Sequence, residues 1–245
     1  REVATIAYAK QPSPPALNPS GPRPNENRAA WIARQHAKQK DFCTPQDRPT
    51  PKVSMERVMK DIKSAMPADA ITTTDAGSFG QWPQRYIEFD YPDSYISPTL
   101  GCMGPGVPSA VAAKLAHPDR TVIAHVGDGG FLMTGQEMAT AKQYGTNIIT
   151  IVYNNEGYNS IRMHQEAQYP GRQYGVGLEN PDFAVMGESY GALGLKVTRD
   201  EEFLPAFKKA LAAERSALIE VQTDYEYVTP SAKLSELSGK KLQGD

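Results

Sequence analysis

Asp128 and Asn155 are the residues of this chain whose types and setting point most directly to chemistry. Asp128 lies in a Gly-Asp-Gly-Gly turn (127–130), and Asn155 is the second residue of an Asn-Asn pair. A carboxylate and an amide oxygen are ligands that a hard cation such as Mg²⁺ accepts. Gly129 and Gly130 carry no side chain that could keep their amides away from phosphate oxygens. Because Mg²⁺ usually shares its coordination shell with phosphates and water, the pattern indicates a diphosphate-bearing cofactor.

Two apolar, β-branched runs must carry these residues. Residues 122–126 lead into the glycine turn, and residues 148–152 lead into the asparagine pair. Runs of this kind, each followed by a tight turn, are typical of buried parallel strands. Parallel strands joined by a right-handed helical crossover end at the same edge of a sheet. We therefore expect Asp128 and Asn155 to converge at that edge.

A helix is predicted between these two strands. Thr134 stands three residues before Glu137, which is the spacing of a capping box. This spacing predicts a helix over residues 135–144. Gly145 is suited to the left-handed position at the C-terminal end of that helix.

Two other glycine turns agree less well with the sequence. Most Asp-Gly turns bond only their own backbone, so Asp128 without Asn155 would not indicate a metal. A nicotinamide-binding Rossmann turn requires a glycine where Leu132 stands and an acid on the second strand. A P-loop requires Gly-Lys-Ser or Gly-Lys-Thr after its glycines, and the sequence contains neither.

The glycine turn and the asparagine pair, at this separation, resemble the cofactor-binding motif of thiamine diphosphate enzymes. Their setting over residues 99–137 is similar to the acetolactate synthase and pyruvate oxidase branch of that family; it reads TLGCMGPGVPSAVAAKLAHPDRTVIAHVGDGGFLMTGQE. The similarity extends over residues 53–221, the span of one C-terminal cofactor-binding domain. The resemblance implies that the cofactors are thiamine diphosphate and Mg²⁺.

The resemblance also implies roles for individual residues. The metal ligands would be Asp128, Asn155 and the backbone carbonyl of Gly157. The Gly101 carbonyl would accept the cofactor's 4′-amino group, and Met103 would wedge between its two rings. The family's turn near Ser78 often carries glutamine and histidine, which are missing here. The residues expected to bind the cofactor are Ser78, Phe79, Gly101, Met103, Gly127, Asp128, Gly129, Gly130, Asn155, Gly157 and Tyr158.

The implied activity is that of a carboligase or decarboxylase of the acetolactate synthase type. Such an enzyme decarboxylates a small-molecule 2-oxo acid and transfers or releases the resulting acyl or aldehyde unit. One alternative is a decarboxylase or lyase acting on another 2-oxo or 2-hydroxyacyl substrate, because residues 157–177 depart from the synthase pattern. The other is a non-catalytic cofactor-binding subunit. Arg162, His164 and Gln165 are candidates for facing the substrate, and Asp75 is either a turn cap or a site residue.

No catalytic residue is assigned within this chain. In the family, the glutamate that activates the cofactor belongs to a separate pyrimidine-binding domain. That domain would come from the parent chain or from a partner subunit, so a homodimer or tetramer is expected. The isolated chain is predicted to be a fragment or one subunit of a split enzyme, which binds cofactor without turning over substrate.

Composition excludes several classes of partner. A net charge of −2 and a pI near 6.1 give no basic surface for nucleic acid. Cys43 and Cys102 are too few for a disulfide framework, which favours a reducing compartment. Neither an apolar run of membrane-spanning length nor a signal-peptide core is present in the sequence. A cytoplasmic protein that does not contact membranes is expected.

The alternation of predicted strands and helices indicates the fold class. It predicts an α/β fold, a doubly wound parallel sheet with helices on both faces. The resemblance implies that this is the thiamine diphosphate-binding fold. Residues 1–51 are interpreted as the end of a preceding domain plus a proline-rich linker. Residues 52–228 would form the cofactor-binding domain, and residues 229–245 a C-terminal tail.

Overall fold

The computed structural model describes residues 26–46 and 48–238. The chain divides into two compact units, residues 1–42 and 43–245. The described part of the first unit is a single helix, α1 (Glu26–Phe42). Residues 1–25, which the sequence analysis assigns to the end of a preceding domain and to a proline-rich linker, lie outside the described residues. The domain boundary at residues 51 and 52 stays a prediction.

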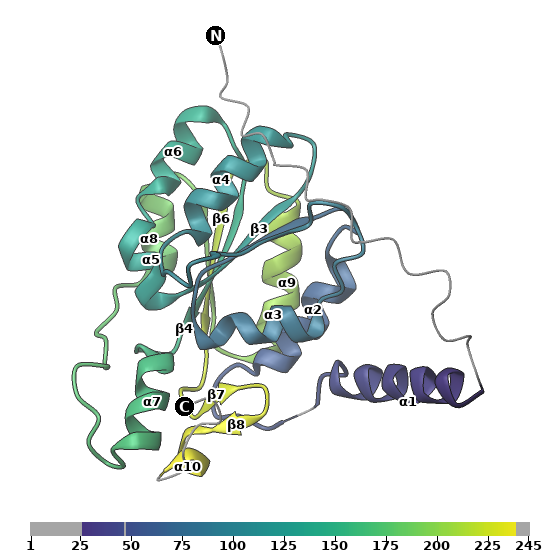
Figure 1. Cartoon of the computed structure of the whole chain (residues 1–245). Coiled ribbons are helices and arrows are strands. Elements are labelled where there is room, and N and C mark those ends of the chain that lie inside the picture. Colours follow the sequence, from purple (N-terminus) through teal and green to yellow (C-terminus); the bar gives the residue numbers. More distant parts are fainter. Residues whose placement is uncertain (1–25, 47, 239–245) are drawn as a thin grey trace. The chain divides into compact units, whose positions relative to one another are not determined.

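Six parallel strands form one sheet in the second unit, in the order β2-β1-β3-β4-β6-β5 (Figure 1). This order places β3 and β4 in the interior of the sheet, and every residue of both strands is buried. The predicted parallel sheet is therefore confirmed. The strands are β1 (Ile71–Thr74), β2 (Tyr95–Ile96), β3 (Val122–Gly127), β4 (Ile149–Asn154), β5 (Leu193–Val197) and β6 (Ala217–Gln222).

Helices cover both faces of this sheet, as the doubly wound class requires (Figure 1). One hydrophobic core lies between the sheet and the helices α2, α3 and α9, and a second core lies between the opposite face and α4, α5, α6 and α8. The first group is α2 (Met55–Ala65), α3 (Gln81–Tyr86) and α9 (Asp200–Leu211). The second group is α4 (Gly106–Ala116), α5 (Asp128–Thr134), α6 (Glu137–Tyr144) and α8 (Phe183–Ser189).

Alternation of side chains along the strands divides them between the two cores. On β3, Ile123 packs into the core under α2 and α9, whereas Ala124 and Val126 pack into the core under α4 and α5. On β4, Ile151 and Val152 divide in the same way. Successive residues of a strand point to opposite faces, so a strand buried on both sides is mostly apolar, and its few polar side chains, such as His125 and Asn154 here, form hydrogen bonds. This is why the two strands read as continuous apolar runs.

The helix ends agree with local sequence signals at several positions. Ser54 caps α2, and its side chain accepts a hydrogen bond from the backbone N–H of Arg57. Asp182 caps α8 in the same way. Gly145 ends α6 with φ of +64°, the left-handed conformation that the sequence predicts there.

The predicted capping box at Thr134 is wrong. A helix, α5, begins directly at Asp128 and ends at Thr134, and α6 follows from Glu137. The Thr134 hydroxyl donates to the carbonyl oxygen of Gly104 at 2.5 Å instead of capping α6. Burial of Phe131 between the sheet and α8 stabilises α5 against the poor helix propensity of its glycines.

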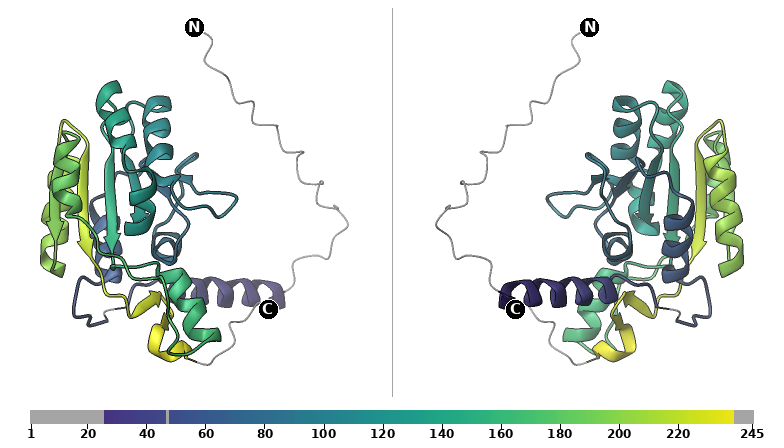
Figure 2. Two further views of the ribbon diagram at one scale, coloured as in Figure 1. Left: turned by 90° about the vertical axis from the view of Figure 1, so that its left-hand side faces the viewer. Right: turned by 90° about the vertical axis from the view of Figure 1, so that its right-hand side faces the viewer.

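Two segments are more ordered than their composition suggests. Residues 157–177, a polar segment with several glycines and no clear hydrophobic period, contain the helix α7 (Asn159–Gln168). Part of the predicted tail folds as a hairpin of β7 (Tyr227–Thr229) and β8 (Ala232–Lys233), followed by α10 (Leu234–Leu237). Figure 2 shows the hairpin, α10 and α7 gathered at one end of the sheet, where they contact one another. These contacts explain why a polar segment without a clear hydrophobic period is helical.

Within residues 26–46 and 48–238, no helix combines the length and the hydrophobicity needed to cross a lipid bilayer.

Candidate cofactor-binding site

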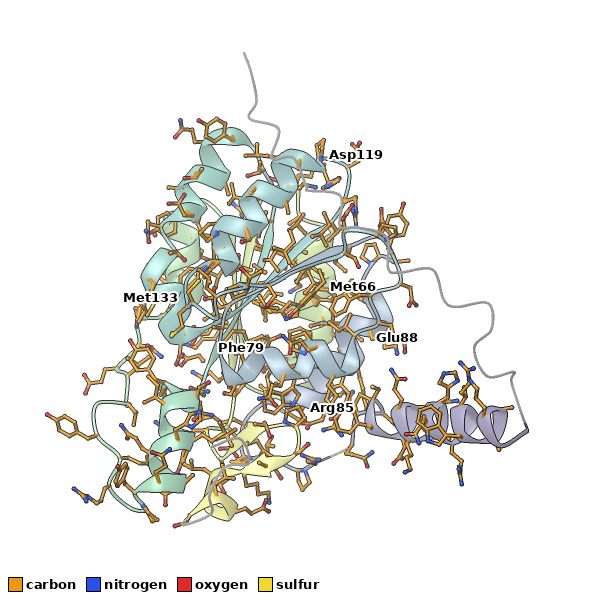
Figure 3. The ribbon with its side chains drawn as sticks, viewed as in Figure 1. Met66, Phe79, Arg85, Glu88, Asp119 and Met133 are labelled. Atoms are coloured by element: carbon orange, nitrogen blue, oxygen red, sulfur yellow. The ribbon has the colours of Figure 1, made fainter. Side chains whose placement is uncertain are left out.

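A cavity of about 220 Å³ lies at the carboxyl ends of β1, β3 and β4. Figure 3 shows Phe79, one of its lining residues, near the end of the sheet that faces α7. The lining includes every residue that the sequence predicts to bind the cofactor: Ser78, Phe79, Gly101, Met103, Gly127, Asp128, Gly129, Gly130, Asn155, Gly157 and Tyr158. The structure therefore brings the predicted residues together, while their individual roles stay predictions.

Asp128 is the first residue of α5 and is only 3% exposed. Its Oδ1 accepts the N–H of Gly129 at 2.8 Å, and its Oδ2 accepts the N–H of Gly157 at 3.1 Å. The side-chain amide of Asn180 also donates to Oδ2, at 2.9 Å. Burial raises the pKa of Asp128, and these hydrogen bonds oppose that rise. The bond from Gly157 shows that the ends of β3 and β4 converge.

Asn155 supplies an oxygen whose environment fits a ligand. Its Oδ1 is buried and has no hydrogen-bond partner among the described residues, and the side chain lines the cavity. A buried acceptor without a donor is unusual and calls for a missing partner. The described chain holds no cluster of three His, Cys, Asp or Glu side chains that could bind a metal. Asp128 and Asn155 could hold Mg²⁺, which needs few protein ligands and fills its shell with phosphate and water.

Gly129 and Gly130 pack tightly against protein groups. A Cβ on Gly129 would overlap the ring of Tyr158, and a Cβ on Gly130 would overlap Oδ2 of Asp75. The sequence suggested only that glycine leaves the backbone open to phosphate. The structure adds that α5 could not lie this close to Asp75 with a larger residue at position 130.

The turn that carries Gly101 and Met103 is held to the end of β1. The N–H of Ala76 donates to the carbonyl oxygen of Cys102 at 3.3 Å. Asp75 accepts the N–H of Gly106 on Oδ1 at 2.5 Å, and burial raises the pKa of this carboxyl group. Asp75 is thus a buried link beside the cavity wall and not part of the lining.

Ser78 and Phe79 connect the turn after β1 to the segment after β4. The N–H of Ser78 donates to the hydroxyl of Ser160 at 2.8 Å. The ring of Phe79 stacks on Tyr153, with 5.7 Å between the ring centroids. Tyr153 and Ser160 also line the cavity. The apolar part of the wall is therefore built from both strand ends.

The candidate substrate residues on α7 do not line the cavity. The lining formed by the described residues does not include Arg162, His164 or Gln165. The Arg162 guanidinium lies over the ring of Tyr225, 5.2 Å from its centroid. Gln165 exchanges two hydrogen bonds with the backbone of Tyr174. A contact of these side chains with substrate stays a prediction.

His125 and Tyr153 form a buried pair under the cavity floor. The His125 Nδ1 lies 2.7 Å from the Tyr153 hydroxyl, and its Nε2 is buried without a partner in the part of the chain that the structure describes. Burial lowers the pKa of His125 to about 3. An unfolded histidine has a pKa of about 6.5. Protonation of this side chain therefore favours the unfolded chain.

The free energy of unfolding should show this effect in acid. Below about pH 6.5 the unfolded chain binds a proton at His125 that the folded chain does not, so stability falls as pH falls, by roughly 1 kcal/mol per pH unit. The raised pKa values of Asp75 and Asp128 act in the opposite direction. Urea titrations between pH 6.5 and 5 should therefore compare the wild type with His125→Asn, which retains a polar atom near the Nδ1 position. The difference between the two free energies of unfolding should shrink as pH falls. A difference that does not change with pH would contradict the prediction.

A family model for the C-terminal TPP-binding domain of thiamine pyrophosphate enzymes matches residues 75–221. The chain belongs to this family. The matched range of the TPP-binding domain contains every residue that lines the cavity. The resemblance stated from the sequence is thereby confirmed.

Relatives of this TPP-binding domain are much longer than the chain. The acetolactate synthase isozyme 2 large subunit of Escherichia coli K12 is 30% identical over 201 residues, which cover 79% of this chain and 37% of that protein. The acetolactate synthase large subunit of Corynebacterium glutamicum is 36% identical over 172 residues, which cover 68% of this chain and 27% of that protein. The chain spans about a third of the length of the curated relatives it matches.

A solved structure supports the same fold. The thiamine diphosphate-dependent 4-hydroxybenzoylformate decarboxylase of Rhodococcus jostii RHA1 matches with a TM-score of 0.69 and 31% identity. The match covers 73% of this chain and 34% of that one. The chain is thus a TPP-binding domain similar to those of acetolactate synthases and of a thiamine diphosphate-dependent decarboxylase.

Besides Asn180, which bonds to Asp128, six lining residues of the TPP-binding domain were not anticipated as part of the site: Ala76, Gly77, Tyr153, Asn159, Ser160 and Ile161. Tyr153 lies directly before the asparagine pair, so the sequence could have predicted that it lies near the carboxyl end of β4. Asn180 precedes Pro181 and Asp182, a sequence that indicates only the start of a helix.

Proposed function

We propose that this domain binds thiamine diphosphate together with Mg²⁺ and is the cofactor-binding part of an enzyme of the acetolactate synthase type. One observation carries the proposal. At one cavity of a TPP-binding domain, the buried carboxylate of Asp128 is joined by the unpartnered amide oxygen of Asn155. These are oxygen ligands suited to Mg²⁺, which commonly bridges protein carboxylates and substrate phosphates.

The residues divide the work of holding the cofactor. Asp128, Asn155 and the backbone carbonyl of Gly157 would hold the ion. The backbone of Gly129 and Gly130 would face the diphosphate, because both residues line the cavity next to Asp128. Opposite charges on ion and diphosphate would then fix one end of the cofactor.

The other end of the cofactor would meet the turn before α4. Gly101 would accept the pyrimidine amino group on its carbonyl oxygen, and Met103 would hold the two rings at an angle. Phe79 and Tyr153 form an apolar part of the cavity wall, which would exclude water from the bound cofactor. Holding a reactive molecule in one conformation lowers the entropic part of the barrier.

When bound, thiamine diphosphate supplies an electron sink for the loss of CO₂ from a 2-oxo acid. The whole enzyme would decarboxylate such an acid and transfer or release the acyl or aldehyde unit. The activating glutamate would come from a pyrimidine-binding domain of the parent chain or of a partner subunit, in a cytoplasmic homodimer or tetramer. A decarboxylase or lyase with another substrate is the second candidate, because the similar solved structure is named as a 4-hydroxybenzoylformate decarboxylase.

Calorimetric titration of the 245-residue chain with thiamine diphosphate tests the proposal. Saturable binding is expected in Mg²⁺, and replacement of Mg²⁺ by EDTA should weaken it by about tenfold or more because the diphosphate loses its counter-ion. Thiamine without the diphosphate is the matched control ligand and should bind more weakly still. Equal affinities with Mg²⁺ and with EDTA would refute the metal-bridged site. Absence of binding in Mg²⁺ would refute the proposed function.

A further inference from the structure

A chain of hydrogen bonds joins Asp128 to the buried carboxylate of Glu220 through two asparagine side chains. Asn180 donates from Nδ2 to Asp128 Oδ2 and to Asn154 Oδ1, in both cases at 2.9 Å. Asn154 in turn donates from Nδ2 to Glu220 Oε1 at 2.9 Å. Asn154 and Glu220 are buried, and Asn180 is half-buried. The site at Asp128 is therefore tied to the interior of the sheet at β6.

The donor and the acceptor of every hydrogen bond between Asp128 and Glu220 follow from the two carboxylates at the ends of the series. A carboxylate group only accepts, so Asn154 must turn its NH₂ toward Glu220 and its oxygen toward Asn180. Asn180 then faces an amide oxygen on one side and the Asp128 carboxylate on the other. Only its NH₂ group satisfies both, because the opposite amide orientation would set oxygen against oxygen. Asn180 is thus a donor to Asp128 by necessity.

The far end of the chain is anchored in the fold. Glu220 accepts the N–H of Phe183 on Oε2 at 3.1 Å and forms an ion pair with Lys196 at 3.6 Å. The ring of Phe183 packs edge-on against Phe131 of α5, with 5.5 Å between the centroids. Movement of Asn180 would therefore disturb contacts at the start of α8 and along α5.

Asn180 also ends a short segment that is strapped to the turn after β4. The N–H of Tyr158 donates to the carbonyl oxygen of Val176, and the N–H of Leu178 donates to that of Glu156, both at 2.9 Å. Gly157 lies within this bridge, paired with Gly177. The proposed ligands Asp128 and Gly157 are consequently held by the same segment, one through a side chain and the other through backbone.

The hydrogen bonds at Asp128 restrict how its carboxylate can bind a cation. A carboxylate offers about four lone-pair positions. Three of them are used by Gly129, Gly157 and Asn180. The remaining position suits a single bond to a metal. Ca²⁺ accepts bidentate carboxylates and irregular shells, whereas Mg²⁺ demands near-octahedral geometry and takes carboxylates through one oxygen readily.

We infer that Asn180 is a positioning residue that keeps Asp128 a one-oxygen ligand and so makes the site select Mg²⁺ over Ca²⁺. The inference rests on the proposed function, since it concerns the same site. Removing the Asn180 donor frees a lone pair on Oδ2 and lets the carboxylate rotate. The affinity for Mg²⁺ then falls, because the Asp128 carboxylate is no longer held in one orientation. The affinity for Ca²⁺ falls less, because Ca²⁺ can bind both oxygens of the rotated carboxylate.

Separate titrations of MgCl₂ and CaCl₂ into the 245-residue chain, each in excess thiamine diphosphate, test the inference. Asn180→Leu should weaken Mg²⁺ binding by about tenfold or more, as loss of outer-shell partners of metal ligands does. Ca²⁺ binding should change by less than about threefold, so the Mg²⁺ to Ca²⁺ preference falls. Asn180→Ala should change the two affinities in the same way, and it replaces Asn180→Leu if the leucine variant does not fold. Asn147→Leu, at an exposed asparagine just before β4, is the matched control and should change neither affinity.

The outcomes separate the inference from the function on which it rests. Equal weakening of Mg²⁺ and Ca²⁺ in both Asn180 variants would show a merely structural role and overturn the inference. Unchanged affinities for both cations would overturn it as well, with the proposed function intact. A wild-type chain that binds neither cation in the presence of thiamine diphosphate would overturn both.

Discussion

Asp128→Ala is expected to weaken thiamine diphosphate binding in Mg²⁺ by at least about a hundredfold, a loss of about 2.7 kcal/mol. Asp128 is the only carboxylate among the residues that line the cavity of the described chain. Without it, the ion keeps only neutral oxygen ligands from the protein, and the diphosphate loses its bridge to α5. Calorimetric titration of the variant with the cofactor measures the effect.

The alanine variant also leaves donors without acceptors, so its control matters. The N–H of Gly157 and the amide of Asn180 would lose their acceptor, at a cost of about 1–3 kcal/mol of stability each. Asp128→Asn keeps the shape and one acceptor oxygen but removes the charge, so it should stay folded and still bind cofactor poorly. Wild-type affinity in a folded Asp128→Ala or Asp128→Asn chain would refute the assignment of the metal site.

The class of the fold was predictable because strands buried on both faces leave a plain signal. Residues 122–126 and 148–152 are apolar except for His125 and Thr150, and they form most of β3 and β4. The order of the strands in the sheet was not predictable, since it depends on pairings between segments far apart in sequence. The short edge strand β2 and the hairpin of β7 and β8 carry too few residues to show a period.

The helices around the site were less predictable than the strands. Thr134 and Glu137 have capping-box spacing by coincidence, because α5 already occupies the residues up to Thr134. Two adjacent glycines disfavour a helix in isolation, and only tertiary burial of Phe131 stabilises one there. The local signals therefore correctly predicted a helical connection between β3 and β4. They did not predict that its first helix begins at Asp128.

The sequence predicted individual residues that line the cavity, but it did not predict the residue that holds Asp128 in place. Asp128, Asn155 and the glycines occur at a spacing that has chemical meaning. Asn180 approaches Asp128 only because residues 176–178 pair with the turn after β4. No pattern in the sequence connects these segments, so a residue that orients the predicted ligand was visible only in three dimensions.

Gly130→Ala is expected to reduce the free energy of unfolding by about 1–3 kcal/mol, the typical cost of overpacking a core. Helix propensity argues for the opposite sign, since alanine is favoured over glycine by about 1 kcal/mol inside a helix such as α5. The structure decides between them. A Cβ at position 130 would overlap Asp75 Oδ2, and Asp75 cannot easily move because its Oδ1 is held by the N–H of Gly106. Urea unfolding of both chains measures the difference.

A double-mutant cycle with Asp75→Ala identifies the cause of that loss. If the overlap with Asp75 is responsible, Gly130→Ala should cost little, or even stabilise the chain, once the carboxyl group is gone, and the two effects will not add. Gly177→Ala is the control for glycine itself, since a Cβ there would meet no heavy atom of the described chain within 4 Å. A loss at Gly130 that persists unchanged in the Asp75→Ala background would contradict the packing argument. The loss of stability would then come from a contact of position 130 other than the one with Asp75.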